Sequence, residues 1–219
     1  MVKVERTFPA PGSLAIESQK KTGHYDKPDV IRQLREDFHD KCYICEIKPL
    51  QDPEVEHLLP HENGKYPERK FDWKNLFWSC GHCNKIKNQE KYAEGILDCC
   101  EQDPEERICF RLQEDNVDVL AKDGQDEKAA RTAELVWEVF NKKNTEMRVV
   151  KSEMRLQELQ KEMNILYDTL ENIKKNPSSK TTARKLKALL RRESGFAAFK
   201  RCYVRDHAEQ FPQLLPYIK

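Results

Sequence analysis

The chain lacks the features that mark several classes of protein. Its 219 residues contain no run of about 18 apolar residues, so we expect no membrane-spanning helix. Its first residues, MVKVERTFPAPGSL, include no apolar core of a secretory signal. It has no G-x4-G-K-[S/T] loop, which excludes a P-loop nucleotide site on this polypeptide. We therefore expect a cytoplasmic protein without a membrane partner.

Apolar residues are also few, and charged residues are many and unevenly placed. Hydrophobic residues make up 38% and charged residues 35%, which predicts a modest core. The net charge of +1 conceals a contrast: residues 94–127 hold twelve acidic and three basic side chains, whereas residues 174–205 hold eleven basic and one acidic. Such a basic stretch is either a solvated helical face or a surface that binds phosphates. The candidates for phosphate contact in it are Arg184, Lys185, Arg191 and Arg192.

Half of the eight cysteines follow a metal-binding pattern. Cys42, Cys45, Cys80 and Cys83 form two C-x2-C pairs, a spacing typical of one tetrahedral structural zinc. Two pairs complete the coordination and leave no open position, so this zinc stabilises the fold and the chemistry must lie between the pairs. We expect the other four, Cys99, Cys100, Cys109 and Cys202, to be ordinary thiols, because disulfides are rare in proteins that are not secreted.

The segment between the two cysteine pairs predicts two strands and a helix. EVEHLLP is typical of a short strand ended by Pro60, and NLFWSC at residues 75–80 of a returning strand. A helix is predicted over residues 84–92. This order brings Glu56, His57 and Asn84 towards one place, because Asn84 directly follows a zinc ligand.

The combined pattern C-x2-C…E-H-x2-P…N-L-x3-C-x2-C-N-x2-K, over residues 42–88, resembles the HNH (ββα-metal) nucleases. The resemblance implies that His57 is the general base that activates water. It implies that Glu56 and Asn84 bind a single catalytic divalent ion, and that Asn75 ties the loop between the strands and orients the histidine. Glu56 stands where Asp is commoner, and Asn84 stands where many members carry His. Asparagine at this position favours a hard ion such as Mg²⁺ or Mn²⁺.

Hydrolysis of a phosphodiester suits these residue types. A neutral imidazole can take the proton of water near neutral pH, and a divalent ion can neutralise the phosphate. Lys85 and Lys87 on the predicted helix are placed to meet a phosphate backbone, and the polar loop predicted over residues 60–71 adds further basic side chains.

Less specific interpretations stay open. The cysteine pairs are also compatible with a zinc-binding module that has no catalytic activity. We expect His61 and His82 to be bystanders. Trp73, Phe77 and Trp78 are expected to form a small core under the zinc site.

The remainder of the chain predicts an arm, a hairpin and several helices. Residues 1–27 are expected to be extended, with a helix from Pro28 to about Asp40. Strands are predicted over residues 108–112 and 117–121, and helices over residues 127–141, 145–175, 180–193 and 195–207. In the long helix, apolar residues from Leu156 to Ile173 recur at alternating steps of three and four, as in a heptad repeat. This stripe either packs against the chain's own last helices, which we favour, or forms a seam for a second protein.

A wider resemblance concerns the approach to CYICE, the DPEERICF segment and the GFAAFKR ending, which are similar to the HNH subunit of the Septu anti-phage system and to subunits beside some retrons. This resemblance implies an ABC/SMC-like ATPase partner that restrains the nuclease until infection. We therefore predict an α+β protein with four regions: an arm and helix (1–40), a zinc-stapled HNH core (41–100), a hairpin (101–125) and a helical region (126–219). The expected function is metal-dependent endonuclease cleavage, with double-stranded DNA as the substrate. The alternatives are an RNA-directed nuclease, for example one acting on tRNA, and a non-catalytic zinc adaptor of the ATPase.

Overall fold

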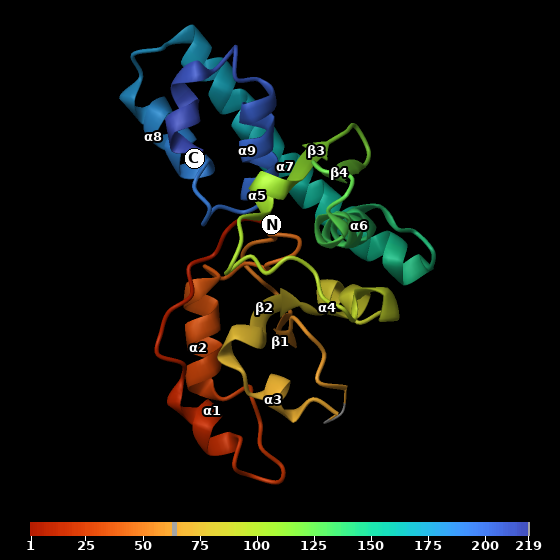
Figure 1. Ribbon diagram of the computed structural model, residues 1–219. Helices are drawn as coiled ribbons and strands as arrows, with labels where there is room; N and C mark the ends of the chain where they lie inside the picture. The colour runs from red at the N-terminus through yellow and green to blue at the C-terminus, as the bar shows by residue number, and fades with distance from the viewer. Residues whose placement is uncertain (63–64, 219) are drawn as a thin grey trace.

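Two small antiparallel sheets and a set of helices make up the chain. The computed structural model describes residues 1–62 and 65–218, so Asn63 and Gly64 of the polar loop predicted over 60–71 lie outside it. Figure 1 shows α1, α2, α3 and the first sheet in one half of the molecule and α8 and α9 in the other, with α5 and the second sheet between them; α7 runs from beside α6 in the middle to the half that holds α8 and α9. The mixed helix-and-sheet class predicted from the sequence is confirmed. No helix in the described part of the chain is long and apolar enough to cross a membrane.

The first sheet and the helix after it occupy the segment between the cysteine pairs. Strand β1 (Pro53–His57) pairs antiparallel with β2 (Leu76–Cys80), with His57 opposite Leu76 and Pro53 opposite Cys80. Helix α4 (Gly81–Lys87) begins directly after β2, because the Cys80 side chain caps it by accepting the backbone N–H of Cys83. The helix is shorter than predicted: it ends at Lys87, and a separate 3-10 turn, η3, covers Glu90–Tyr92.

The N-terminal arm contains one helix that the sequence did not predict. Residues 1–27 were expected to be extended, yet α1 spans Gly12–Glu17. Its start is held by Asp29, whose carboxylate accepts hydrogen bonds from the backbone N–H and the hydroxyl of Ser13. The predicted helix at Pro28 is present as α2 (Pro28–Asp37), with Pro28 at the first helical position. It ends before Asp40 because His39 and Asp40 have positive φ values of 55° and 57°.

The polar segment between the strands is mainly irregular. It contains the one-turn helix α3 (Pro67–Lys70), and the 3-10 turn η2 (Trp73–Asn75) leads into β2. Trp73, Phe77 and Trp78 are buried, as expected of core residues.

A hairpin covered by a helix forms the middle of the molecule. After the one-turn helix α5 (Pro104–Arg107), β3 (Ile108–Leu112) pairs with β4 (Val117–Ala121), as the alternation of apolar residues predicts. Helix α6 (Glu127–Asn141) packs on the hairpin and has the predicted bounds. The Asp126 side chain caps α6 by accepting the N–H of Ala129.

The last part of the chain is helical. The helices are α7 (Glu146–Lys175), α8 (Lys180–Leu189) and α9 (Ala197–Asp206), followed by the 3-10 turn η4 (Pro212–Tyr217). The predicted helix over 180–193 therefore ends four residues early. The heptad stripe of α7 is buried from Leu156 to Leu170, and Ile173 packs against the core. The favoured interpretation, packing within the chain, is confirmed, and this stripe offers no free seam for a second protein.

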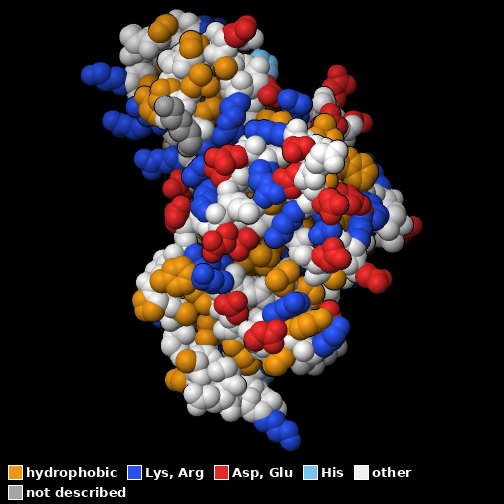
Figure 2. Space-filling model, viewed as in Figure 1, with side chains coloured by type: hydrophobic (Ala, Val, Ile, Leu, Met, Phe, Trp, Pro, Cys, Tyr) orange, Lys and Arg blue, Asp and Glu red, His pale blue; other side chains and the backbone are white. Residues whose placement is uncertain are grey.

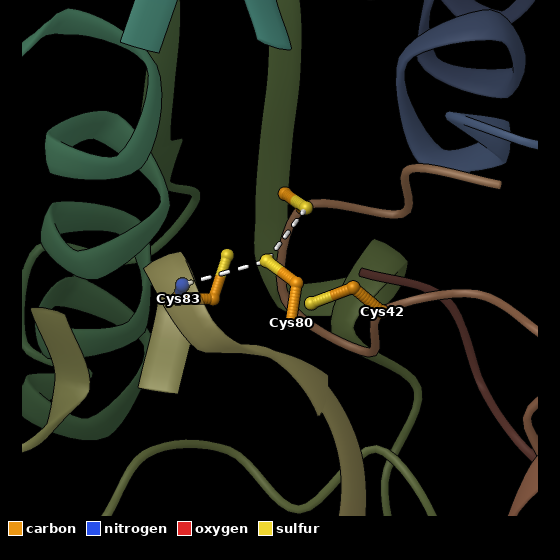
Figure 3. A group of neighbouring side chains, drawn as sticks. Cys42, Cys80 and Cys83 are labelled. Carbon is orange, nitrogen blue, oxygen red and sulfur yellow. Dashed lines mark hydrogen bonds between the residues drawn. The ribbon is translucent and has the colours of Figure 1, made fainter. Parts of the chain in front are cut away.

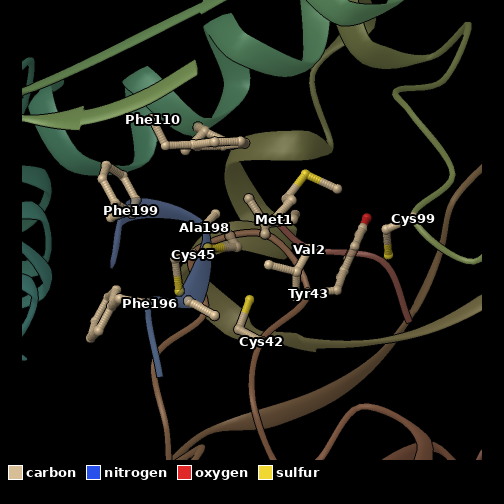
Figure 4. Close-up of a cluster of buried hydrophobic side chains, with 14 of the residues drawn as sticks. Met1, Val2, Cys42, Tyr43, Cys45, Cys99, Phe110, Phe196, Ala198 and Phe199 are labelled. Atoms are coloured by element: carbon tan, nitrogen blue, oxygen red, sulfur yellow. The ribbon is translucent and has the colours of Figure 1, made fainter. Parts of the chain in front are cut away.

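One hydrophobic core joins the N-terminal arm, the first cysteine pair, the hairpin and α9. In Figure 4, Val2, Tyr43 and Cys45 lie in the same cluster as Phe110 and Phe199. The two halves of the molecule are therefore bound to each other through shared apolar contacts. The division of the chain at residues 40, 100 and 125 stays a prediction.

Candidate functional site

The four cysteines that sequence spacing assigns to zinc lie together. Cys42, Cys45, Cys80 and Cys83 are all buried, and their sulfur atoms lie within 4.8 Å of one another (Figure 3). Four thiolates at this spacing suit a tetrahedral zinc with Zn–S bonds of about 2.3 Å. The structure thus confirms a closed four-cysteine cluster that could bind a structural metal.

A positive charge from the far end of the sequence contacts this cluster. The Arg155 guanidinium, on α7, donates from Nη2 to Cys80 Sγ at 3.1 Å and is itself buried. A guanidinium at this position offsets part of the negative charge that four thiolates bring to a metal. Arg155 lies 75 residues from Cys80 and carries no local motif, so sequence reasoning did not find it.

A cavity of about 440 Å³ lies beside the first sheet. Its wall comes from Tyr25 of the arm, from the end of β1 and the segment after it, and from residues between Asn84 and Ala93. Four of the predicted site residues, Glu56, His57, Asn84 and Lys87, line this cavity. The structure therefore brings together the residues that the order of elements predicted to meet.

His57 is held in one orientation by a backbone carbonyl. Its Nε2 lies 3.1 Å from the carbonyl oxygen of Lys70, and its ring meets Tyr25 edge-on at a centroid distance of 4.5 Å. A carbonyl oxygen can only accept, so Nε2 carries the hydrogen and the lone pair of the neutral ring is on Nδ1. Burial lowers the pKa of His57 to about 4, so the ring is neutral at neutral pH.

Asn75 fixes the segment that provides this carbonyl. Its side chain accepts from the N–H of Leu59 at 2.8 Å and donates to the carbonyls of Leu59 and Arg69 at 2.9 and 3.0 Å. Arg69 directly precedes Lys70, whose carbonyl holds His57. The bonds that tie the inter-strand segment are thus present, and the catalytic importance of Asn75 stays a prediction.

Glu56 points into the protein and its carboxylate is fully engaged. The Lys87 ammonium lies 2.5 Å from Oε1, and the Tyr43 hydroxyl donates to Oε2 at 2.6 Å. Burial raises the pKa of Glu56, and the charge of Lys87 opposes this shift. Lys87 also donates to the backbone carbonyl of His57 at 2.9 Å.

Asn84 is turned to a different carboxylate. Its Nδ2 donates to Oε2 of the neighbouring Glu54 at 2.6 Å. With an ammonium beside Glu56 and Asn84 bonded to Glu54, the side chains in this arrangement do not fit a divalent ion shared by Glu56 and Asn84. The assignment of these two residues as ligands of Mg²⁺ or Mn²⁺ stays a prediction.

The basic residues predicted to contact phosphate differ in their surroundings. Lys85, Arg184, Lys185 and Arg191 are exposed, whereas Lys87 is buried in its ion pair. Arg192 pairs with Asp103 and lies 3.8 Å from Glu105, so its charge is partly neutralised.

Helix α8 and the cavity lie in opposite halves of the molecule. Figure 1 places α8 far from β1 and α3, and Figure 2 shows basic side chains projecting over the region of α8. The structure therefore does not bring the basic residues of α8 to the cavity.

Two further residues of the cavity were not predicted as functional. Tyr25 reaches His57 from the arm, and His61, expected to be a bystander, lies with its ring centroid 4.8 Å from that of His57. The signal for His61 was its place directly after Pro60, four residues from His57. His82 differs: it is buried, it donates from Nε2 to the carbonyl of Val139, and it does not line the cavity.

Comparison with known proteins gives one partial match. A segment of 66 residues is 36% identical to the Septu protein PtuB of Bacillus thuringiensis, and it covers 29% of this chain and 25% of that protein. This chain is therefore similar to a Septu protein over part of its length. No known family profile matches the chain. The match spans about a quarter of the relative's length, so the relative's whole activity does not transfer to this chain.

Proposed function

We propose that this protein is an HNH-type endonuclease that hydrolyses phosphodiester bonds in anti-phage defence. The observation that carries the proposal is the setting of His57: a neutral imidazole, fixed through Nε2 to the Lys70 carbonyl, in a cavity beside a four-cysteine cluster. The similarity to a Septu protein supports the biological setting.

His57 supplies the base. A water molecule beside the free Nδ1 would give its proton to the ring as its oxygen attacks phosphorus. General base catalysis of this kind contributes roughly 10²–10⁴-fold to the rate. With a pKa of about 4 the ring is unprotonated across the neutral range, so its lone pair is not already occupied by a proton.

The proposal includes dependence on Mg²⁺ or Mn²⁺. Glu56 and Asn84 offer carboxylate and amide oxygens, which such ions prefer. Binding between them requires that Lys87 leaves Glu56 and that Asn84 leaves Glu54. Zinc in the cysteine cluster would hold β2 and α4 together and take no part in the chemistry.

An ATPase subunit is the proposed partner. Because the heptad stripe is buried, we assign the contact to a second apolar stripe at the start of α7. Met147, Val150 and Met154 expose 64%, 53% and 58% of their surface and follow one another at helical spacing. Exposed apolar side chains on one helix face are typical of protein interaction sites.

The test compares the wild-type protein with His57→Ala. Each is incubated with supercoiled plasmid DNA and with tRNA, in Mg²⁺ or Mn²⁺, with and without the co-expressed ATPase. Cleavage of DNA by the wild type but not by His57→Ala supports the proposal. Cleavage of tRNA without cleavage of DNA supports the RNA-directed alternative. Cleavage of neither substrate in any arm leaves the non-catalytic zinc adaptor, and equal cleavage by His57→Ala removes His57 from the mechanism.

A further inference from the structure

His61 has an unusual environment for a bystander. It is half-buried, it lines the same cavity as His57, and the two rings meet edge-on with an interplanar angle of 74°. Its Nδ1 is buried and has no hydrogen-bond partner among the described residues. Buried polar atoms in proteins are nearly always paired, so an unpaired ring nitrogen beside a candidate base points to a ligand that completes it.

Hydrolysis of a phosphodiester needs two proton transfers. One proton leaves the attacking water, and one must reach the departing oxygen, which is a poor leaving group as an alkoxide. His57 can serve only the first transfer, because its Nε2 is bonded to the Lys70 carbonyl and only Nδ1 is free. In this arrangement Lys87 is paired with the Glu56 carboxylate at 2.5 Å and donates to the backbone carbonyl of His57 at 2.9 Å.

The other titratable groups of the cavity are poorly suited to the second transfer. Burial raises the pKa of Tyr25 and that of Tyr92 above the usual value of 10, so these hydroxyls give up a proton even less readily. Glu62 and Glu90, which also line the cavity, are exposed, and the Lys65 ammonium lies 2.9 Å from the Glu62 carboxylate. Imidazole is the side chain that changes its charge near neutral pH. Among the described residues of the cavity, His61 is the remaining histidine.

We infer that His61 is the second acid–base residue of this site and protonates the departing oxygen of the phosphodiester. This inference rests on the proposed nuclease function. The oxygen of water forms a bond to phosphorus, and the bond from phosphorus to the departing oxygen breaks. The proton of water goes to Nδ1 of His57, and the proton held by His61 goes to the departing oxygen. The two rings then exchange one proton with solvent to restore the starting state.

A substrate with a better leaving group tests the role directly. Once the product ends show which oxygen departs, that bridging oxygen is replaced by sulfur, which leaves as a thiolate without being protonated. Cleavage of the normal substrate by His61→Asn should fall roughly 10²-fold or more, whereas its cleavage of the sulfur substrate should stay within about tenfold of wild type. His57→Ala should be impaired on both substrates. The matched control His207→Ala, a half-buried histidine outside the cavity, should cut both at the wild-type rate.

Two results would overturn the inference. One is cleavage of the normal substrate by His61→Asn at the wild-type rate. The other is an equal loss of activity of His61→Asn on both substrates, as a merely structural residue would show. If the wild-type protein cuts neither substrate, the proposed function fails. The role of His61 is then tested by titrating the intact protein with inorganic phosphate and following the ring ¹⁵N resonances of its histidines. A shift of the His61 resonance that is absent for His207 supports a phosphate-facing imidazole, and an unchanged resonance refutes it.

Discussion

Replacing Asn75 with alanine should separate the stability of the inter-strand segment from the orientation of His57. The Asn75 side chain is 5% exposed and makes three hydrogen bonds of 2.8–3.0 Å to Leu59 and Arg69. At about 1 kcal/mol net for each bond, Asn75→Ala should lower the free energy of unfolding by about 3 kcal/mol. For a chain of this size that corresponds to a fall in Tm of about 6–12 °C.

The variant should also lose activity while it is still folded. The segment that Asn75 ties includes the Lys70 carbonyl, which positions His57, and a displacement of about 1 Å can reduce a rate about 10²-fold. Single-turnover cleavage of plasmid at 25 °C, with folding checked by circular dichroism, measures this loss.

Asn141 offers a matched control far from the cavity. Its side chain accepts from the N–H of Val117 at 3.0 Å and donates to the Val117 carbonyl at 2.8 Å, so it ties a strand in the same way. Asn141→Ala should lower the unfolding free energy by about 2 kcal/mol and leave cleavage unchanged. If Asn75→Ala loses stability as expected but cuts at the wild-type rate, the orientation of His57 through this segment is refuted.

Four other perturbations have defined outcomes. The pKa of His57 is about 4 in the folded state and about 6.5 in the unfolded state, so the folded state binds fewer protons between these pH values. The free energy of unfolding, measured by denaturant titration, should therefore fall as the pH drops from about 6.5 towards 4, and this fall should be smaller for His57→Ala. Cys83→Ser should lower zinc content and Tm together, whereas His57→Ala should keep both. Arg155→Met should weaken zinc retention against a chelator by about tenfold or more. Lys87→Met leaves the Glu56 carboxylate buried without its ion pair, so it should lower the free energy of unfolding by about 3–5 kcal/mol. Mg²⁺ should raise the Tm of Lys87→Met, and it should not raise the Tm of a double variant that also lacks the Glu56 carboxylate.

The elements that were predicted correctly are those whose sequence pattern lies within a short segment of the chain. The hairpin over 108–121 and the helix from Glu127 to Asn141 follow from clear alternation and periodicity, and both were found at the predicted residues. The cysteine cluster follows from spacing alone, because each C-x2-C pair forms within one turn.

The features that could not be predicted from the sequence depend on contacts between residues that are distant along the chain. Helix α1 was missed because its start is held by the side chain of Asp29, sixteen residues away. The pairing of Lys87 with Glu56 was missed because a lysine on a helix can meet solvent phosphate or a buried carboxylate, and only the packing of α4 on β1 selects between them. His61 was underestimated because its neighbour in space, Tyr25, comes from another part of the chain.

The contact between Arg155 and Cys80 bears on how a partner could influence the cavity. Arg155 lies on α7 directly after Met154, the last residue of the exposed apolar stripe. The sulfur of Cys80, which accepts the Arg155 hydrogen bond, also caps α4 through the N–H of Cys83. Helix α4 carries Lys87, whose ammonium neutralises Glu56 in the wall of the cavity. A partner bound to the stripe would therefore act on the helix that touches the cysteine cluster, and the cluster is joined to the cavity by one short helix.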